Sequence, residues 1–224
     1  MSRLVVKIGG AVARDTAAHL LGDDLAASRH ELVVVHGAGP QISAEMERRE
    51  LPVRFVGGRR VTSPEALEVV RESMAVVNAA VCSAVGPRAI GLMGDEIGLR
   101  ASLVPELGRV GDPIPSCPPA IEAALEAGLI PVVAPLAAGP LNVNADEMAA
   151  ALAVGLGAQR LLFLTDVPGL LLAGKVVPRI AAADAEALLD DDLLEGGILP
   201  KLSAAVRAAR SGVQADLGET AVVA

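Results

Sequence analysis

LVVKIGG, at residues 4–10, is a short aliphatic run that contains one lysine and ends in a glycine pair. A run this short and this apolar predicts a strand covered on both faces, as the strands of a parallel sheet are. The glycine pair predicts a turn at the carboxyl end of the strand, where open α/β sheets bind their ligands. Backbone N–H groups of such a turn can approach phosphate oxygens, although the pattern is not the longer Walker glycine loop.

The same order of strand, glycine turn and helix recurs along the chain. Residues 32–35 form a second aliphatic strand, followed by His36-Gly37-Ala38-Gly39 and by Pro40, which is well placed to open a helix. Further strands are expected at residues 89–92, 129–134, 161–165 and 220–223, and helices at 15–28, 64–85, 119–127, 144–155, 183–189 and 199–210. The alternation predicts an α/β fold, a three-layer sandwich with a mainly parallel central sheet and helices on both faces.

The composition limits the class of protein. The chain has 224 residues, of which 52% are hydrophobic, enough for one α/β domain or two small lobes that share a sheet. No apolar run approaches the roughly 18 residues of a membrane span, and the amino terminus has no signal-peptide pattern. Two cysteines, Cys82 and Cys117, predict no disulfide framework. We therefore expect a cytoplasmic protein without a membrane partner.

The formal net charge of −8 argues against general nucleic-acid binding, which needs a basic surface. Within that acidic chain lysine and asparagine are scarce. Of 19 cationic residues 16 are arginine, and the lysines are Lys7, Lys175 and Lys201. The asparagines are Asn78, Asn142 and Asn144. A composition this biased leaves lysine and asparagine enriched at positions where arginine or aspartate will not serve, so they are the first candidates for chemistry.

Two further clusters hold residue types suited to an anionic ligand. GGRR, at residues 57–60, predicts a hairpin turn, from which Arg60 could hold a carboxylate by two parallel hydrogen bonds. LNVNAD, at residues 141–146, contains two of the three asparagines. Strand alternation points Asn142 and Asn144 to the same side, and the aspartate that follows opens a helix.

Lys201 lies at the end of GGILPK, residues 196–201, where a helix is expected to begin. A cation is unfavourable at a helix amino terminus, so its presence there indicates a bound anion. The three histidines, at positions 19, 30 and 36, have no metal-ligand spacing, and we predict no metal site made of protein side chains.

The helix expected at residues 64–85 has two notable features. Thr62 and Glu65 have the spacing of a capping box at its start. From Met74 onward charge is absent for over two turns, which predicts burial on more than one side. One face can cover the sheet, and the other would expose an apolar strip, taken to include Val77, that a second copy of the chain would cover. We therefore expect a homodimer; the alternative is a helix sandwiched within one subunit.

These motifs, in this order, resemble those of the amino-acid kinase superfamily, and of the acetylglutamate kinases most closely. LNVNAD and the glycine-to-lysine segment at 196–201 are the most specific, and LTDVPGL at residues 164–170 is similar to the nucleotide-site turn of the family. The resemblance implies ATP as cofactor, with Mg²⁺ carried by its phosphates, and N-acetyl-L-glutamate as substrate. It also implies that residues 1–140 form a substrate-binding and dimerising lobe, and residues 141–224 an ATP-binding lobe.

The resemblance assigns roles residue by residue. Lys7 and Lys201 would stabilise the transferring phosphoryl group, and Asp146 would hold both lysines in position. The remaining substrate-binding residues would be Gly10, Ala38, Gly39, Arg60, Asn142 and Asn144, with Arg60 and Asn142 on the α-carboxylate. The nucleotide-binding residues would be Gly9, Asp166, Val167, Pro168, Gly169, Leu170, Leu171, Leu193, Leu194 and Glu195. Lys175 matches nothing catalytic and is expected on an exposed hairpin.

The chemistry agrees with these roles. A glutamate side chain, with a pKa of about 4.3, is already an anionic nucleophile at neutral pH, so no catalytic base is needed. The difficulty is the approach of one anion to another, which two lysines, Mg²⁺ and oriented backbone dipoles would offset. Two departures from the family pattern stand out. Ala38 replaces a glycine, so its methyl group is expected near the acyl group, and the chain ends soon after Leu217, which indicates a shortened nucleotide lobe.

Two other functions remain open at this stage. One is a kinase for aminoadipate or glutamate linked to a carrier protein, which the Asn142-Val143-Asn144 motif and the acidic chain disfavour. The other is a non-catalytic binding protein of the same fold, which the presence of both Lys7 and Lys201 disfavours. An assay of ATP consumption with free N-acetylglutamate separates the three.

Overall fold

The computed structural model describes residues 2–9, 30–165, 168–190, 194 and 197–224. The helix expected at residues 15–28 lies outside these residues. A sheet of eight strands runs through the described part of the chain, in the order β14-β16-β15-β11-β1-β2-β8-β5. Neighbouring strands pair in parallel except β15 and β16, which are antiparallel. The predicted mainly parallel sheet is therefore confirmed.

The strands of this sheet are short, and most match the aliphatic runs of the sequence. They are β1 (Arg3–Ile8), β2 (Glu31–His36), β5 (Ala89–Met93), β8 (Ile130–Ala134), β11 (Arg160–Leu164), β14 (Arg179–Ala181), β15 (Gln214–Leu217) and β16 (Thr220–Val223). The sequence did not predict β14 or β15. Both are strands of three or four residues with exposed or polar side chains between buried ones, such as Asp216 beside Ala215 and Leu217.

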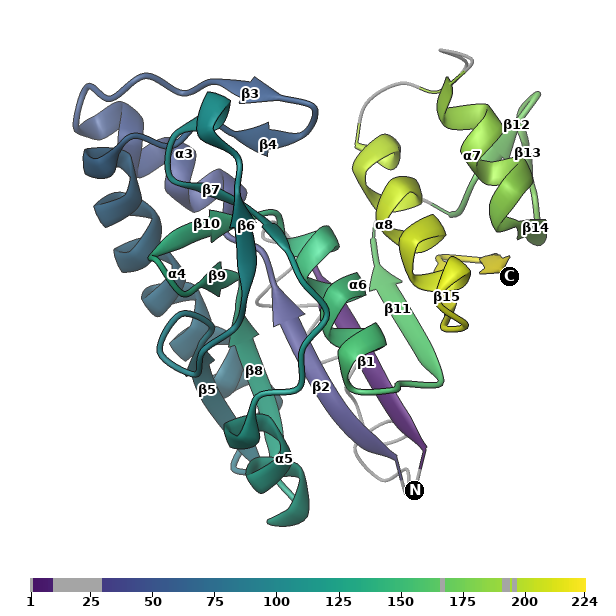
Figure 1. Cartoon of the computed structure of the whole chain (residues 1–224), viewed down its shortest axis with the longest axis horizontal. Coiled ribbons are helices and arrows are strands. Elements are labelled where there is room, and N and C mark those ends of the chain that lie inside the picture. Colours follow the sequence, from purple (N-terminus) through teal and green to yellow (C-terminus); the bar gives the residue numbers. More distant parts are fainter. Residues whose placement is uncertain (1, 10–29, 166–167, 191–193, 195–196) are drawn as a thin grey trace.

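Helices cover both faces of the sheet, as Figure 1 shows. Buried residues of α3 (Gly39–Arg48) and α4 (Pro64–Val85) form one core cluster with one face of the strands. Buried residues of α5 (Pro119–Glu126), α6 (Ala145–Gly155), α7 (Ala182–Asp190) and α8 (Ile198–Arg210) form a second cluster with the other face. Within the described residues no helix is long and apolar enough to cross a membrane.

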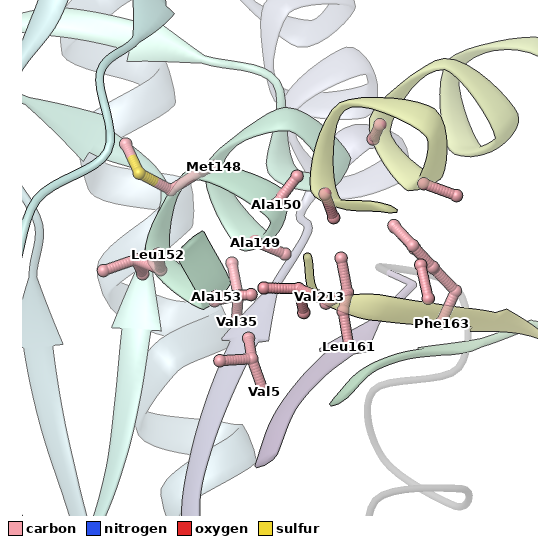
Figure 2. Packing of buried hydrophobic residues seen from close by; sticks show 14 of the residues in the cluster. Val5, Val35, Met148, Ala149, Ala150, Leu152, Ala153, Leu161, Phe163 and Val213 are labelled. Atoms are coloured by element: carbon pink, nitrogen blue, oxygen red, sulfur yellow. The ribbon is translucent and has the colours of Figure 1, made fainter. Parts of the chain in front are cut away.

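The alternation of β1 decides which way its lysine points. Leu4, Val6 and Ile8 belong to the cluster with α3 and α4, whereas Val5 belongs to the cluster with α6 and α8. Side chains two residues apart in a strand share a face, so Lys7 points toward α6. Figure 2 shows Val5 beneath α6, whose Ala149 and Ala153 carry small side chains that let the helix lie close to the strands.

Smaller sheets and hairpins surround the carboxyl ends of the central strands. One has the order β6-β7-β10-β9 and contains β6 (Ala101–Leu103), β7 (Val110–Pro113), β9 (Leu136–Ala137) and β10 (Leu141–Val143); a 3₁₀ turn, η1, spans Pro105–Leu107. The predicted GGRR hairpin is formed by β3 (Phe55–Val56) and β4 (Arg59–Arg60). Gly57 and Gly58 both have positive φ, +54° and +75°, as a tight two-residue hairpin turn requires. Lys175 is exposed, in the hairpin of β12 (Leu171–Leu172) and β13 (Lys175–Val176).

Helix α4 corrects two predictions. The residue that caps it is Ser63, whose hydroxyl oxygen accepts a hydrogen bond from the Ala66 N–H; Thr62 instead donates its hydroxyl proton to the Arg60 carbonyl. Against the described part of the chain, the helix is also buried on one side only. Val77 faces the core at 5% exposure, so placing it in the exposed strip was wrong, and Val76 at 70% exposure lies there instead.

Candidate active site

A cavity of about 360 Å³ opens at the carboxyl ends of β1, β2 and β11. Each of these strands is followed directly by a residue that lines the cavity: Gly9, Gly37 and Thr165, respectively. In Figure 1 the β3–β4 hairpin and the first turn of α8 lie on either side of these strand ends. The site therefore forms where open α/β sheets bind ligands, because successive parallel strands bring their carboxyl ends to one edge.

Three charged side chains from three distant elements meet in this cavity. Lys7 Nζ lies 2.9 Å from Asp146 Oδ1, and Lys201 Nζ lies 3.7 Å from Asp146 Oδ2. Lys7 comes from β1, Asp146 from the first turn of α6 and Lys201 from the first turn of α8. One carboxylate thus holds two ammonium groups, and the cluster keeps a net charge of +1 at the cavity wall.

Asp146 owes its position to the cap of α6. The Asn144 side-chain oxygen accepts hydrogen bonds from the N–H groups of Asp146, at 2.9 Å, and Glu147, at 3.2 Å. The Asn144 amide nitrogen donates to the Gly58 carbonyl of the hairpin at 3.1 Å. A carboxylate in the first turn of a helix is favourably placed relative to the helix dipole. Asn144 therefore fixes the start of α6 and joins it to the hairpin across the cavity.

Lys7 and Lys201 differ in how much water reaches them. The Lys7 side chain is 7% exposed, and burial lowers its pKa, an effect that Asp146 opposes and Lys201 reinforces. The Lys201 side chain is 18% exposed, and its Nζ also donates to the Gly197 carbonyl at 3.3 Å. An anion that entered the cavity would favour the charged form of Lys7.

Arg60 is a buried cation without an acidic partner among the described residues. Its Nη2 donates to the Gly39 carbonyl at 3.0 Å and to Ser43 Oγ at 2.9 Å, and its guanidinium carbon lies 4.6 Å from the centre of the Phe55 ring. The residue is 6% exposed, and burial lowers its pKa. A buried charge is costly unless it is paired, so the cavity face of Arg60 is suited to a ligand carboxylate.

Asn142 reaches the same part of the cavity through Thr62. The Asn142 amide nitrogen donates to Thr62 Oγ1 at 3.0 Å, and the Thr62 hydroxyl donates to the Arg60 carbonyl at 2.8 Å. All three residues are buried. The chain of hydrogen bonds fixes Asn142 relative to Arg60, although β10 and β4 lie far apart in the sequence.

The segment after β2 supplies backbone groups. The Gly37 N–H donates to the Ile8 carbonyl at 3.0 Å, which joins the turn after β2 to the end of β1. Ala38 is the residue before α3, so the first N–H groups of that helix start at the cavity. Ala38 has φ −141°, which an L residue adopts without strain, and at 1% exposure it packs in the core cluster that contains Ile42. The expectation that its methyl group lies near the acyl group of the substrate stays a prediction.

The cavity brings together nine of the predicted site residues. They are Lys7, Gly9, Ala38, Gly39, Arg60, Asn142, Asn144, Asp146 and Lys201. Five others, Gly10, Asp166, Val167, Leu193 and Glu195, lie outside the described residues. Pro168, Gly169, Leu170, Leu171 and Leu194 are described but do not line this cavity. Gly169 and Leu170 pack at Thr220, whose hydroxyl oxygen accepts a hydrogen bond from the Leu170 N–H at 2.8 Å.

Sequence reasoning missed several residues that shape the cavity. Arg59 lines it and forms an ion pair with Glu147 at 2.9 Å, beside Asp146. Phe55 stacks on Arg60, and Thr62 joins Arg60 to Asn142. The sequence pattern predicts Thr62 as a helix cap, and it does not separate Arg59 from Arg60. Strand alternation would place these neighbouring arginines on opposite faces of the hairpin, yet both line the cavity.

Residues 2–216 match the model of the amino acid kinase family, and the chain belongs to that family. The fold agrees: the structure titled smu.665 from Streptococcus mutans UA159 superposes with a TM-score of 0.87 at 29% identity, over 99% of this chain and 98% of that one. Carbamate kinase from Giardia lamblia bound to AMP-PNP, at 15% identity and a TM-score of 0.75 over 99% of this chain and 98% of that chain, shares the fold alone.

Two relatives within the family are acetylglutamate kinases. Acetylglutamate kinase from Thermus thermophilus is 40% identical over 220 residues, which cover 93% of this chain and 87% of that protein. Acetylglutamate kinase from Rubrobacter xylanophilus is 42% identical over 226 residues, which cover 97% and 88%. The chain is therefore a member of the acetylglutamate kinases.

Proposed function

We propose that the protein transfers the γ-phosphoryl group of ATP to the side-chain carboxylate of N-acetyl-L-glutamate. The products are ADP and N-acetyl-L-glutamyl 5-phosphate, a step of arginine biosynthesis. The observation that carries the proposal is the joint placement, in one cavity, of the Lys7–Asp146–Lys201 cluster and of Arg60, which has no acidic partner among the described residues. The first suits a phosphoryl group that gains charge, and the second suits a substrate carboxylate.

In this proposal Arg60 and Asn142 bind the α-carboxylate and orient the substrate. The side-chain carboxylate, ionised at neutral pH, then points at the lysine cluster without the help of a general base. Lys7 and Lys201 neutralise negative charge on the transferring group and on the leaving oxygen. Asp146 keeps both ammonium groups at fixed positions, so little reorganisation is needed during transfer.

ATP with Mg²⁺ fits the described residues. Two ammonium groups, Gly9 and the amino terminus of α3 offer donors to phosphate oxygens, whereas no group of three metal-ligating side chains occurs within the described residues. The single acidic residue of the cluster, Asp146, is already engaged by two lysines. Mg²⁺ would therefore arrive on the nucleotide phosphates, where it supplies charge neutralisation.

The division of labour along the chain is part of the same proposal. Residues 1–140 would bind N-acetylglutamate and form a homodimer through α4, and residues 141–224 would bind ATP. We also propose that Pro168 to Leu171 and Leu194 contribute to the nucleotide site. The proposed location is the cytoplasm. Cys82 and Cys117 are both free thiols, which suits a reducing compartment.

A direct assay tests the proposal. Purified protein is given ATP, Mg²⁺ and free N-acetyl-L-glutamate, and ADP release is measured together with trapping of the acyl phosphate by hydroxylamine. We expect both signals, and both should be lost when glutamate replaces N-acetylglutamate. ADP release only with a carrier-linked glutamate or aminoadipate would favour the alternative kinase. Binding of N-acetylglutamate without ADP release would show a non-catalytic member of the fold.

A further inference from the structure

The third asparagine of the chain lies away from the cavity, on α4, and the proposed mechanism does not use it. Asn78 is 5% exposed and is surrounded by β2, β8 and β5. Its amide nitrogen lies 2.8 Å from the Val132 carbonyl and 3.1 Å from His36 Nε2. A buried polar side chain with two short contacts to separate strands has a defined orientation.

The contacts of Asn78 fix the protonation of His36. A backbone carbonyl only accepts hydrogen bonds, so the atom near Val132 must be the amide nitrogen of Asn78. The second proton of that nitrogen faces His36 Nε2, which must therefore accept it. The imidazole proton is then on Nδ1, which lies 3.4 Å from the Gly37 carbonyl. His36 is completely buried, and burial lowers its pKa to about 4, so the ring is neutral at physiological pH.

The residues around Asn78 restrict its side chain to the orientation that contacts Val132 and His36. A Cβ atom on Gly91 of β5 would lie 2.1 Å from Asn78 Oδ1 and 3.2 Å from Cys82 Sγ. Gly91 has no positive φ, so glycine is required there by space and not by backbone conformation. Asn78 Oδ1 is also 3.7 Å from the Cys82 thiol, a weak donor. An asparagine is held in place from all sides, whereas a larger side chain would not fit.

His36 is in turn the first residue of the segment that reaches the cavity. It ends β2, and Gly37, Ala38 and Gly39, which follow it directly, all line the cavity. The Gly37 N–H donates to the Ile8 carbonyl, next to Lys7, and the Gly39 carbonyl accepts from Arg60. A displacement of His36 would therefore move backbone groups beside both the lysine cluster and Arg60.

We propose that Asn78 and His36 form a positioning pair, in which α4 holds the 37–39 backbone in the geometry that N-acetylglutamate and the phosphoryl group require. The inference rests on the proposed kinase function. Neither residue lines the cavity, so both act through the backbone of the segment they anchor.

The test compares variants that keep or remove the contact. His36→Gln keeps an acceptor at the end of the side chain, and His36→Leu removes it. Asn78→Asp keeps the shape but replaces the donor by a carboxylate, which repels the Val132 carbonyl and attracts a proton to His36. Ser73→Ala, at another buried polar residue of the same helix, is the matched control.

We expect His36→Leu and Asn78→Asp to lower kcat/KM for N-acetylglutamate by about tenfold or more, because small displacements of a catalytic geometry are costly. The KM for ATP should change little, His36→Gln should recover most of the loss, and Ser73→Ala should behave as the wild type. If His36→Leu and Ser73→Ala have the same kcat/KM, or if Gln and Leu at position 36 are equivalent, the positioning role is wrong.

An NMR titration gives a second reading that does not depend on turnover. The chain has three histidines, so their ring signals are resolvable. The His36 ring of the wild type should not titrate between about pH 6 and 8, whereas in Asn78→Asp it should. A His36 ring that titrates near neutral pH in the wild type would overturn the inference even in an active enzyme. Absence of wild-type kinase activity together with an unchanged titration would instead refute the proposed function and leave the pair intact.

Discussion

Two kinds of cation line the cavity, and their partners separate their roles. Lys7 and Lys201 share the carboxylate of Asp146, whereas Arg60 has carbonyl and hydroxyl acceptors and an aromatic ring. A cation whose charge is neutralised by a fixed carboxylate suits a group that gains negative charge only in the transition state. A buried cation without a neighbouring carboxylate suits a negative charge that the substrate already carries when it binds.

We expect Lys201→Ala to lower kcat by about a hundredfold or more while the KM for N-acetylglutamate changes little, since transition-state charge is what Lys201 would stabilise. In the wild type Asp146 lies 2.9 Å from Lys7 and 3.7 Å from Lys201, so we expect the closer Lys7–Asp146 pair to persist in the variant. Steady-state kinetics at saturating ATP measure the effect. Near-normal turnover of the variant would remove Lys201 from the catalytic group.

Arg60→Ala should give the opposite pattern. Loss of a charged hydrogen-bonding group is worth about 1.5–3 kcal/mol, so we expect the KM for N-acetylglutamate to rise by about tenfold to a hundredfold with kcat largely kept. Arg60→Lys should recover only part, because an ammonium group cannot form two parallel hydrogen bonds to a carboxylate. Equal KM values for wild type and Arg60→Ala would show that the substrate carboxylate binds elsewhere.

His36 makes stability depend on pH in a predictable direction. Its pKa is about 4 in the folded protein and near the ordinary 6.5 in the unfolded chain, so below pH 6.5 the unfolded chain binds the extra proton. Stability is therefore lost as the pH falls from about 6.5 toward 4. From these two pKa values, the loss due to His36 between about pH 8 and pH 5 is about 2 kcal/mol.

Urea unfolding of the wild type and His36→Gln at these two pH values measures this contribution. The difference in unfolding free energy between the two pH values should be about 2 kcal/mol smaller in the variant. His30→Gln, at an exposed histidine, controls for the loss of one ring. An equal pH dependence for the wild type and His36→Gln would show that His36 is not buried in neutral form.

At the level of single residues, the sequence located the charged cluster because lysine and asparagine are rare in it. Lys7, Lys201 and Asn144 all line the cavity. The sequence could not reveal Thr62 as the link between Arg60 and Asn142, since that contact joins residues 80 positions apart. Contacts of this kind depend on where the small sheet places β10 beside the hairpin, which no local pattern encodes.

Helices and strands with strong apolar periodicity were predictable to within one or two residues. The start of α4 was placed correctly and its cap was not, because Thr62, Ser63 and Glu65 offer two overlapping cap patterns. In the structure the Thr62 hydroxyl donates to the Arg60 carbonyl within the site. The Ser63 hydroxyl oxygen is the one that accepts a hydrogen bond from the first turn of the helix. Strand β14, at the edge of the sheet, and strand β15, between β16 and β11, were not predicted, because polar side chains such as Asp216, paired with Arg160 at 2.7 Å, interrupt the apolar pattern.

We expect Ser63→Ala to lower the unfolding free energy by about 1 kcal/mol, the usual cost of losing an amino-terminal cap. The Ser63 hydroxyl accepts from the Ala66 N–H at 3.1 Å and donates to Glu65, and alanine can do neither. Ser83→Ala, at an exposed serine near the other end of α4, should change stability by less than about 0.5 kcal/mol. Thermal or urea unfolding compares the two, and equal effects would argue against the cap.

At the scale of the whole molecule, one face of α4 is left uncovered by the residues that the structure describes. Met74, Val77 and Val81 face the core, but Ala75 and Ala79 are exposed and Val76 is 70% exposed, more than any other large hydrophobic residue described. The exposed strip follows the stretch in which charged residues are absent. A soluble protein seldom leaves an apolar strip on a long helix in water, which indicates that a partner covers it.

The partner that best fits the strip is a second copy of the chain. A two-fold axis across α4 would place Val76 and Ala79 of one helix against the same residues of the other, so that one apolar surface covers itself. Charged residues such as Glu72, which pairs with Arg49, would lie at the rim of that contact. The same helix carries Asn78 on its inner side, so dimerisation would also hold the helix that positions the 37–39 backbone.

Sedimentation velocity at micromolar concentration tests this assembly. We expect the wild type to sediment as a dimer and Val76→Glu to sediment as a folded monomer, because a carboxylate at the centre of the strip would be buried without a partner. Leu103→Glu, at a leucine that is 53% exposed on β6, is the matched control and should remain dimeric. A monomeric wild type, or a folded Val76→Glu that stays dimeric, would show that α4 is not the dimer interface. A monomeric Val76→Glu with a raised KM for N-acetylglutamate would further show that the contact supports the cavity through α4.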